Sequence, residues 1–435
     1  MKLRGAAGAL AVAACAGAFA AASREHASGH GGSEVAGPFA MLAAAPGAAR
    51  ARMAPAPRAG VIPRRHAAPA SSGPAFDGRG YRLALAPYAF RFPRDHAAHP
   101  DYRTEWWYYT GHLDVPGSPA GRSRYGYELT FFRVGIDTAW RASRSAWAPR
   151  EILFAHLALT DLRAGRFRFD ERIARPALGM AGADAARYHT WVDDWSARLL
   201  DDGRTHRLRA RMSPEPGRTG SDSIAIALDL VPAKPAACHG ALGVSRKSLA
   251  RGNASRYYSL TRLAANGSLS IGGRSLAVTG DSWMDHEFGS SELAPGQVGW
   301  DWFGLQLDDG RDLMLYRIRL RDGGTEPASS GTLVERDGRT RRLPLAAFAI
   351  ERLATWKSNR TGGVYPVQWR VRVPAQGLDL RVTPEVADQE LVTASAGGMA
   401  YWEGAVAIEG TAGGRRVLGR GYVELTGYAG APLRF

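Results

Sequence analysis

Cysteine is almost absent from this chain of 435 residues. Its two cysteines, Cys15 and Cys238, lie far apart, and neither belongs to a Cys-x-x-Cys pair. This excludes the disulfide framework of small secreted domains and the commonest structural zinc motifs. If Cys15 is lipidated or removed, Cys238 stands alone. We therefore expect no internal disulfide, and a fold that is held together by its apolar core.

Lysine is also scarce, although the formal net charge is +15. The basic residues are nearly all arginines, and they are scattered along the chain. No run of them alternates with aromatic residues, as a nucleic-acid-binding module would require. We therefore expect no nucleic acid as a partner and only weak attraction to an anionic membrane surface.

A long, strongly apolar run is missing as well. The alanine-dominated stretch GAAGALAVAA is too weak for a transmembrane helix, but it follows the positive start MKLR and precedes Cys15. Small residues before a cysteine are typical of a bacterial lipoprotein signal; a plain signal peptide cut after Ala18-Phe19-Ala20 is the alternative. The sequence thus predicts a signal peptide over 1–22 and a periplasmic or secreted protein, with Cys15 as a possible lipid anchor.

Residues 23–78 contain almost no aromatic side chains and consist mainly of Ala, Pro, Gly, Ser and Arg. Such a composition cannot bury enough apolar surface to offset the entropy of ordering. We interpret this stretch as a disordered tether. Aromatic residues become frequent from Tyr81 onward, where we expect the folded part to begin.

Long amphipathic helices are not evident in the folded part. The best helical candidate is a short segment from Pro344 to Leu353. Turn dipeptides instead separate short alternating runs, which indicates an antiparallel, all-β sandwich or barrel. The turns are Asp202-Gly203, Asn266-Gly267, Gly272-Gly273, Asp309-Gly310, Asp337-Gly338 and Gly413-Gly414, and the runs include YGYELTFFR, FAHLALTD, LSIGGRSLAV and DLMLYRIRL.

A weak internal repeat divides the folded part into two copies, 79–290 and 291–435. Three matches occur in the same order: Trp107-x-Tyr109-x-Gly111 with Trp300-x-Trp302-x-Gly304, Trp195 and Gly203 with Trp369 and Gly377, and Gly280–Asp285 with Gly419–Glu424. In the second copy Glu424 replaces Asp285 and Leu425 replaces His286. The histidine is therefore not needed to build the strand.

The stretch GDSWMDHEFG, residues 280–289, carries the most chemistry. In a regular strand Asp281, Trp283, Asp285 and Glu287 share one face, and His286 points the other way. A bulge would bring Asp285 and His286 together. A carboxyl group beside an indole in an apolar cavity has a raised pKa and acts as a general acid. A polar strand end that only hydrogen-bonds a loop is the alternative.

Two other chemistries fit this stretch poorly. A serine esterase built on Gly280-Asp281-Ser282 needs a later histidine, yet His286 is the last one, and no G-x-S-x-G motif occurs. A metal site would need a His-x-x-x-His motif or a cysteine pair to support the acidic residues. We therefore expect neither a serine hydrolase nor a bound metal.

For each further candidate residue, a purely structural role is the alternative to a functional one. Glu105, Trp107 and Tyr109 share one strand face and could line a ligand cavity. Glu105 could instead form an ion pair with Arg103 or Arg133. His156 lies on the apolar face of FAHLALTD and suits either a ligand contact or a satisfied core position. Tyr257 and Tyr258 suit either ligand binding or packing.

Together, EWWYYTGHL, FAHLALTD, GDSWMDHEFG and GWDWFGLQLDDGRDLMLYRIR resemble the carotenoid 1,2-hydratase (CrtC)/AttH-like family of lipocalin-like proteins, often called predicted secreted hydrolases. The resemblance covers residues 80–435. It implies two tandem lipocalin-like antiparallel β-barrels, an apolar ligand and no cofactor. In the hydratase branch an acid protonates an isoprenoid C=C bond and water adds to the carbocation. Asp285 best matches that acid.

On this basis we expect a monomer that converts or binds a lipophilic small molecule. In the enzyme hypothesis Asp285 is the acid, His286 tunes it or relays its proton, and Trp283 stabilises cationic charge. Tyr258 positions water, and Asp281 adds a second carboxyl group. The alternative is a non-catalytic lipid carrier that accompanies an ABC transporter at a membrane surface. A hydrolase with an activated water is the third hypothesis.

Overall fold

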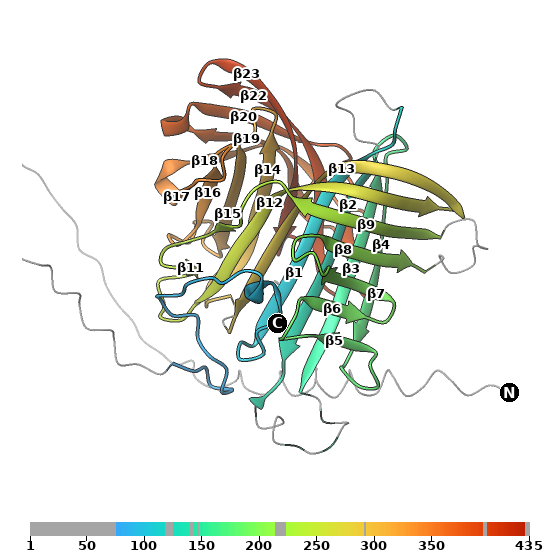
Figure 1. Ribbon diagram of the computed structural model, residues 1–435. Helices are drawn as coiled ribbons and strands as arrows, with labels where there is room; N and C mark the ends of the chain where they lie inside the picture. Colours follow the sequence, from blue (N-terminus) through green and yellow to red (C-terminus); the bar gives the residue numbers. More distant parts are fainter. Residues whose placement is uncertain are drawn as a thin grey trace, which may run out of the picture. The chain divides into compact units, whose positions relative to one another are not determined.

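Alternating side chains and glycine turns fold this chain into antiparallel β-sheets, seen in a computed structural model (Figure 1). The structure describes residues 75–117, 125–138, 143, 145, 148, 150–213, 223–290, 293–394 and 398–430. The expected signal peptide, Cys15 and nearly all of the expected tether lie outside these residues. Residues Ser71–Phe435 form one compact unit. No helix of the described part is long and apolar enough to cross a membrane.

The first sheet runs in the order β4-β3-β2-β1-β13-β12-β9-β8-β7-β6-β5 and is nearly barrel-shaped; β10 and β11 also pair with β12. All its pairings are antiparallel, and neighbouring hairpins make up much of it. Its strands are β1 (Thr104–Asp114), β2 (Tyr125–Gly135), β3 (Glu151–Asp161), β4 (Arg166–Ala174), β5 (Ala181–Ala183), β6 (His189–Val192), β7 (Trp195–Leu199), β8 (His206–Met212), β9 (Ile224–Pro232), β10 (Ala237–Cys238), β11 (Ser245–Arg246), β12 (Ala254–Ile271) and β13 (Arg274–Gly289).

The second sheet runs in the order β17-β16-β15-β14-β23-β22-β20-β19-β18, with β21 paired to β22, and forms a half-barrel. In Figure 1 it is drawn in brown to red. Its strands are β14 (Gln297–Leu307), β15 (Asp312–Leu320), β16 (Ser330–Val334), β17 (Thr340–Pro344), β18 (Ala349–Lys357), β19 (Val364–Val373), β20 (Leu378–Pro384), β21 (Glu390–Val392), β22 (Ala400–Ala412) and β23 (Arg415–Thr426). The predicted all-β class with two tandem sheets is therefore confirmed.

The predicted helix at 344–353 is wrong. Only Leu345–Ala347 forms a single 3₁₀ turn, like Arg94–His96 and Pro374–Gln376 elsewhere, and the chain then enters β18. β18 pairs with β19 along its whole length. Pairing with a neighbouring strand therefore outweighs the helix propensity of the Leu, Ala, Glu and Arg residues in this segment.

The two sheets repeat one topology, because β1, β13, β12 and β9 in the first correspond to β14, β23, β22 and β20 in the second. Asp285 pairs with Tyr108, and Glu424 pairs with Trp302. Asp285 and Glu424 are thus equivalent, as the sequence match predicts. Tyr108 is then the equivalent of Trp302, so the predicted match of Trp107 with Trp300 is one residue out of register.

The match of Trp195 with Trp369 is wrong by one strand. Trp195 lies in β7, whose equivalent is β18, whereas Trp369 lies in β19. Both residues are fully buried tryptophans that come shortly before a glycine turn. A large buried residue before a turn recurs in many hairpins, and such a pattern does not distinguish one hairpin from the next.

Each sheet has its own apolar core on one face, and the other faces pack against each other. Trp107, Tyr109 and Trp195 belong to the first core, and Trp369 and Trp402 belong to the second. We call the contact region between the sheets the seam; its apolar cluster consists of Tyr108, Tyr257, Trp283, Trp302, Met314, Tyr316, Ile318, Ala405 and Tyr422.

The backbones approach closely at one point of the seam. A Cβ atom at Gly126 of β2 would lie 2.6 Å from the Tyr422 hydroxyl and 2.8 Å from the Ala405 Cβ. Glycine therefore lets β2 pack tightly against β22 and β23.

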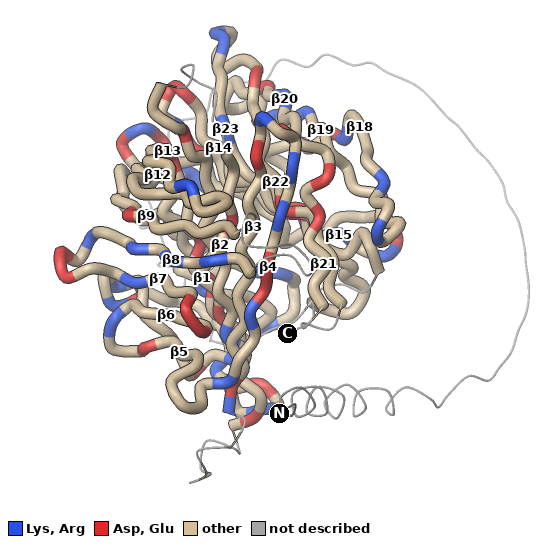
Figure 2. The backbone as a smooth tube through the Cα atoms, turned by 90° about the vertical axis from the view of Figure 1, so that its right-hand side faces the viewer, with Lys and Arg blue, Asp and Glu red and all other residues tan. Residues whose placement is uncertain are grey.

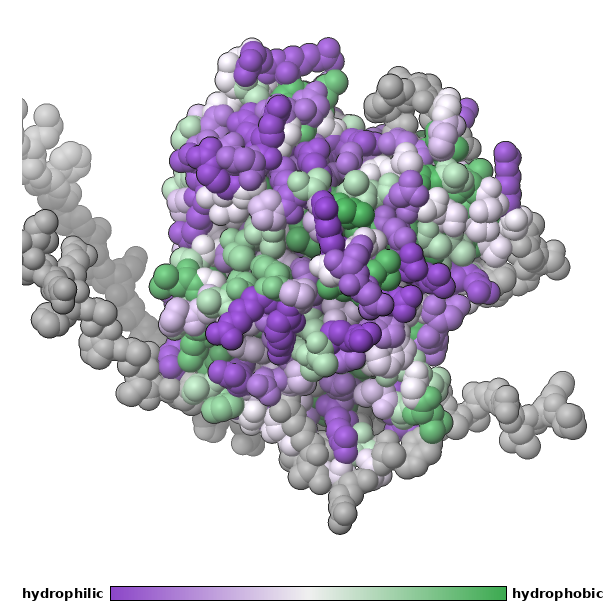
Figure 3. Space-filling view, viewed as in Figure 1, coloured by the Kyte–Doolittle hydropathy of each residue, from purple (hydrophilic) through white to green (hydrophobic). Residues whose placement is uncertain are grey.

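The surface is mixed in character. Figure 2 shows basic and acidic positions interspersed along the tube. On the face drawn in Figure 3, hydrophobic residues form small patches between hydrophilic ones.

Candidate functional site

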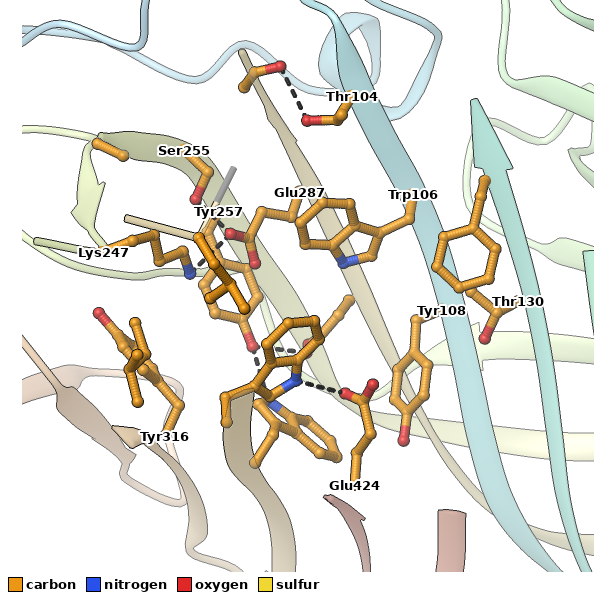
Figure 4. A pocket seen from close by; sticks show the side chains of 18 residues that line it. Thr104, Trp106, Tyr108, Thr130, Lys247, Ser255, Tyr257, Glu287, Tyr316 and Glu424 are labelled. Carbon is orange, nitrogen blue, oxygen red and sulfur yellow. Dashed lines mark hydrogen bonds and ion pairs between the residues drawn. The ribbon is translucent and has the colours of Figure 1, made fainter. Parts of the chain in front are cut away.

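A pocket opens in the seam and encloses about 1120 Å³ of space free of atoms, its mouth included (Figure 4). Strands of both sheets contribute to it, and seven of its 18 lining residues are aromatic. Its lining consists of Thr104, Trp106, Tyr108, Thr130, Phe132, Lys247, Ala254, Ser255, Tyr257, Asp285, Glu287, Gly289, Leu293, Trp300, Trp302, Tyr316, Ile318 and Glu424. An aromatic cavity with few polar groups is typical of a site for a small lipophilic molecule.

Asp285 reaches this pocket because β13 is a regular strand in the stretch that carries it. Its Cα partners are Tyr108 on β1 and Ser259 on β12, and the register is continuous with Glu287. The nearest bulge lies on β12, between Leu260 and Leu263. Strict alternation therefore places Asp285 on the seam face and His286 on the opposite face.

The Asp285 carboxylate accepts hydrogen bonds from neutral groups. Tyr257 donates its hydroxyl at 2.5 Å, Trp283 donates Nε1–H at 2.6 Å, and the Ser259 hydroxyl donates as well. Within the described residues no Arg, Lys or His forms an ion pair with it. Burial raises the pKa of Asp285 to about 7, although the three donors act in the opposite direction. At neutral pH the group can therefore both donate and accept a proton.

Glu424 is a second carboxyl group of the pocket. The Trp300 indole Nε1–H donates to it at 3.1 Å, and burial raises the pKa of Glu424 to about 7; the nearby Asp285 carboxylate raises it further. In Figure 4 the dashed line that ends at the Glu424 carboxyl group marks this hydrogen bond. Equivalent positions on two strands of the repeat thus each place a carboxyl group in the same cavity.

The third carboxyl group of the pocket has a cation beside it. Lys247 Nζ lies 2.6 Å from Glu287, which also accepts a hydrogen bond from the Ser255 hydroxyl. The same ammonium lies over the Tyr316 ring at 4.6 Å. Glu287 is therefore suited to positioning Lys247 at the pocket wall rather than to proton transfer.

The aromatic walls hold one another in fixed orientations. The ring centroids of Trp302 lie 5.2 Å from Tyr108 and 5.9 Å from Trp283, both edge to face. Trp302 also donates Nε1–H to the Tyr257 hydroxyl at 2.9 Å. Faces of electron-rich rings around one cavity stabilise a positive charge that forms inside it.

His286 and Tyr258 lie on the other side of the sheet. His286 bonds Glu105 at 2.9 Å and Tyr258 at 3.1 Å, inside the first core. The expected tuning or relay between His286 and Asp285 is thus wrong in geometry, because the pleat directs the side chains to opposite faces. Tyr257, not Tyr258, contacts Asp285, for the same reason.

Glu105, Trp107 and Tyr109 also face the first core and line no part of the pocket. Glu105 bonds Arg133 at 3.1 Å, as one of the sequence hypotheses had it. Trp107 donates to the His96 carbonyl at 2.9 Å, and Tyr109 bonds the Tyr188 hydroxyl at 2.8 Å. These residues build the wall that positions β1.

Two remaining candidates lie in or near the seam but outside the pocket. The His156 Nδ1 bonds the Tyr401 hydroxyl at 2.6 Å, and burial lowers the pKa of His156 to about 3. Asp281 pairs with Arg420 at 3.1 Å at a partly exposed end of the seam. Neither residue lines the pocket beside Asp285.

One group among the described residues has the spacing of metal ligands: His99, Glu105 and His286 offer ligand atoms within 4.8 Å of one another. Their atoms already bond each other, since both histidines lie 2.9 Å from the same Glu105 oxygen. Arg133 supplies a further positive charge there. The group is a saturated polar cluster.

Sequence reasoning missed Glu424, Trp300, Trp302, Lys247 and Glu287 as pocket residues. The repeat contained the necessary information for Glu424, since it aligns with Asp285. Strand alternation places Glu287 on the face of Asp285, but Lys247 carries no comparable pattern, and only the pairing of distant strands brings it beside Glu287.

The fold agrees with the comparisons to known proteins. The AttH-like family model matches residues 83–428, so the chain belongs to the AttH-like family. An AttH protein of Nitrosomonas europaea is 36% identical over 79% of this chain and 100% of its own, with a TM-score of 0.68. Kievitone hydratase from Nectria haematococca shares the fold, at 14% identity over 82% of this chain and 98% of its own, with a TM-score of 0.58. No curated protein matches the chain.

Proposed function

We propose that this protein is a hydratase of a lipophilic small molecule with an isoprenoid-like C=C bond, and that Asp285 is its general acid. One observation carries the proposal: a buried carboxyl group with a pKa of about 7 lines an aromatic pocket. Such a group holds a proton near neutral pH and can deliver it to a substrate without first passing it to water.

The proposed reaction begins when the Asp285 proton moves to one alkene carbon. The π electron pair forms the new C–H bond and leaves a positive charge on the neighbouring carbon. The face of Trp302, which lines the pocket, stabilises that charge. Trp283 does not line the pocket, and together with Tyr257 and Ser259 it donates to the carboxylate and stabilises it. Water then adds through its oxygen, and its surplus proton returns to Asp285, so that alkene plus water gives the alcohol.

The relatives favour this class of reaction without naming the substrate. Kievitone hydratase has the same fold, and its name describes addition of water to a small molecule. The walls of the pocket agree with a ligand that offers mainly apolar surface.

The experiment has two steps. Mass spectrometry of a solvent extract of the purified protein identifies a bound lipid, and turnover of acyclic isoprenoids is then followed in ¹⁸O-labelled water. We expect one labelled oxygen in the product. Asp285→Asn should lower turnover about 100-fold or more and leave binding almost unchanged. Asp229→Asn, which alters a surface aspartate paired with Arg207, is the matched control.

A carrier of lipophilic molecules, acting beside an ABC transporter, is the second candidate. It is favoured by the engagement of both Asp285 oxygens in hydrogen bonds within the protein. A carrier would bind the extracted lipid, release it unchanged, and give no labelled product. In that case Asp285→Asn would transfer lipid between vesicles at the wild-type rate.

We also propose that the chain is exported and anchored through Cys15. The supporting pattern is the positive start, the alanine-rich stretch and the small residues before Cys15. Cell fractionation with palmitate labelling tests this. Labelled protein in the membrane fraction, lost in Cys15→Ala, is the expected result; unlabelled soluble protein in the periplasm points to the plain signal peptide.

A further inference from the structure

Five buried polar atoms in the seam find no hydrogen-bond partner among the described residues. Each belongs to a side chain that is 1% exposed. They are Thr110 Oγ1, His112 Nε2, Glu128 Oε2, His156 Nε2 and Glu403 Oε2. Buried polar atoms in native proteins are nearly always satisfied, and ordered water satisfies those that protein groups do not reach.

These atoms lie on one patch rather than scattered through the fold. Thr110 and His112 follow Tyr108 along the seam face of β1, and Glu128 is the cross-strand partner of Thr110 on β2. The His112 ring lies 5.7 Å from the ring of Tyr422, which comes from the second sheet. The patch therefore runs along β1, between the two sheets.

One end of the patch reaches the pocket. Tyr108 lines the pocket and donates its hydroxyl to Glu403 at 2.6 Å. Thr130 also lines the pocket and donates to Glu128. Glu403 is in turn the cross-strand partner of Glu424. The unpartnered oxygens of Glu403 and Glu128 thus begin one side chain behind the pocket wall.

The other end of the patch reaches solvent. Asp281 is the cross-strand partner of His112, and Asp114 continues the row on β1. Arg420 bridges these two carboxylates at 2.9 and 3.1 Å. The three side chains are 24–37% exposed. Polar groups therefore extend from the pocket wall to the surface without crossing either apolar core.

The charge state of the patch suits water. Burial raises the pKa of Glu128 to about 8 and that of Glu403 well above its usual range, while burial lowers the pKa of His112 to about 3. Both acids are then largely neutral and donate as well as accept. Neutral donors and acceptors in a row are the partners that a chain of water molecules requires.

We propose that a file of water molecules occupies the seam from Glu403 to the Asp114–Arg420–Asp281 cluster and supplies water to the pocket from behind. Its purpose rests on the proposed hydration: a lipophilic substrate that fills the mouth blocks water there, and each turnover consumes one water. Glu128, at the pocket end of the row, and Thr110, its cross-strand partner, act as positioning residues for this file.

A crystal structure of the full chain at high resolution tests the file directly. We expect ordered waters within hydrogen-bond distance of at least three of the five atoms. A dry seam, in which the same atoms bond each other or other protein groups after a change of rotamer or tautomer, would overturn the proposal.

Hydrogen–deuterium exchange of the Glu128 carboxyl group, followed by infrared spectroscopy and assigned with Glu128→Gln, tests the file in solution. Thr110→Val keeps the shape of the side chain but removes the hydroxyl, and it should slow exchange at least 10-fold. Thr110→Ser and Thr190→Val, a buried threonine outside the seam, should exchange like wild type. Equal rates in Thr110→Val and wild type would contradict the file.

This readout needs no substrate, so it separates the two proposals. If exchange is slowed but no labelled product forms, the water file is supported and the proposed hydratase function is contradicted. Where labelled product does form, Thr110→Val should lower kcat about 10-fold at unchanged KM, because substrate binding uses the pocket alone. If labelled product forms and the kcat of Thr110→Val equals that of wild type, the hydratase function is supported and the water file is contradicted.

Discussion

Glu105 and Asp285 are two buried carboxylates that lie on opposite faces of the same sheet, and their surroundings differ in charge. Glu105 contacts His99, His286 and Arg133, and hydrogen bonds from the histidines together with the Arg133 charge hold its pKa well below the usual range despite its burial. In the described part of the chain the hydrogen-bond donors to Asp285 are a tyrosine, a serine and an indole, and burial raises the pKa of Asp285 to about 7.

The difference shows that burial alone does not make a carboxyl group a proton donor. Counter-charges decide the outcome: cations near Glu105 compensate its lost hydration, whereas neutral donors near Asp285 compensate it only in part. The face of the sheet that carries Glu105 is suited to holding β1, β2 and β13 together. The face that carries Asp285 is suited to proton transfer.

The largest expected effect comes from removing a counter-charge on the Glu105 side. Arg133→Met leaves Glu105 buried with one cation fewer, and this should lower the free energy of unfolding by about 3–5 kcal/mol. Urea denaturation measures it. The control is Arg207→Met, at a partly exposed pair with Asp229, where about 1 kcal/mol or less is expected. A loss below 1 kcal/mol for Arg133→Met would contradict the contrast.

The next effect is the pH dependence of stability. Because the folded pKa of Asp285 lies above the unfolded value of 3.8, its contribution is fully present below about pH 4 and is lost as the pH rises to 7. Between pH 5 and 7 the loss amounts to about 2 kcal/mol. Because asparagine is neutral at every pH, the stability of wild type should therefore fall relative to that of Asp285→Asn as the pH rises from 4 to 7.

Parallel curves for those two proteins would mean that Asp285 titrates in the folded state as it does in the unfolded state. Glu105 works in the opposite direction, since its folded pKa is lowered: its contribution is present above about pH 4.5 and is lost as the pH falls further. Glu105 therefore contributes to the loss of stability at acid pH, and Asp285 contributes to the loss of stability as the pH approaches 7.

A smaller effect is expected from the donors of Asp285. Tyr257→Phe removes a hydrogen bond to the carboxylate, which should raise the pKa of Asp285 by about one unit. A titration of the carboxyl band by infrared spectroscopy measures this shift. Movement toward lower pH instead would show that Tyr257 stabilises the protonated form.

The smallest effect is expected across the sheet. His286→Gln should destabilise the fold by about 1–3 kcal/mol but leave the titration of Asp285 within about 0.3 units of wild type, because the two side chains point apart. The same infrared titration measures the pKa of Asp285 in this variant, and urea denaturation measures its stability. A change of one unit or more in the pKa of Asp285 would support the proton relay between His286 and Asp285, which the geometry contradicts.

The sequence predicts much of the fold, because alternation and glycine turns are local properties. Two β units, the equivalence of Asp285 and Glu424, and the opposite directions of Asp285 and His286 all follow from period-2 strands. The sequence cannot say which face of β13 meets the second sheet, because both faces carry aromatic and polar residues. It therefore could not separate Tyr257 from Tyr258, or place Trp300 and Trp302 opposite Asp285.

The account depends most on the protonation of Asp285 in the folded protein. The most direct measurement is the infrared difference spectrum of wild type minus Asp285→Asn, recorded from pH 4 to 9. The account predicts a protonated carboxyl band that disappears with a midpoint near pH 7. A midpoint at or below about pH 4, the value of a free aspartate, would contradict it.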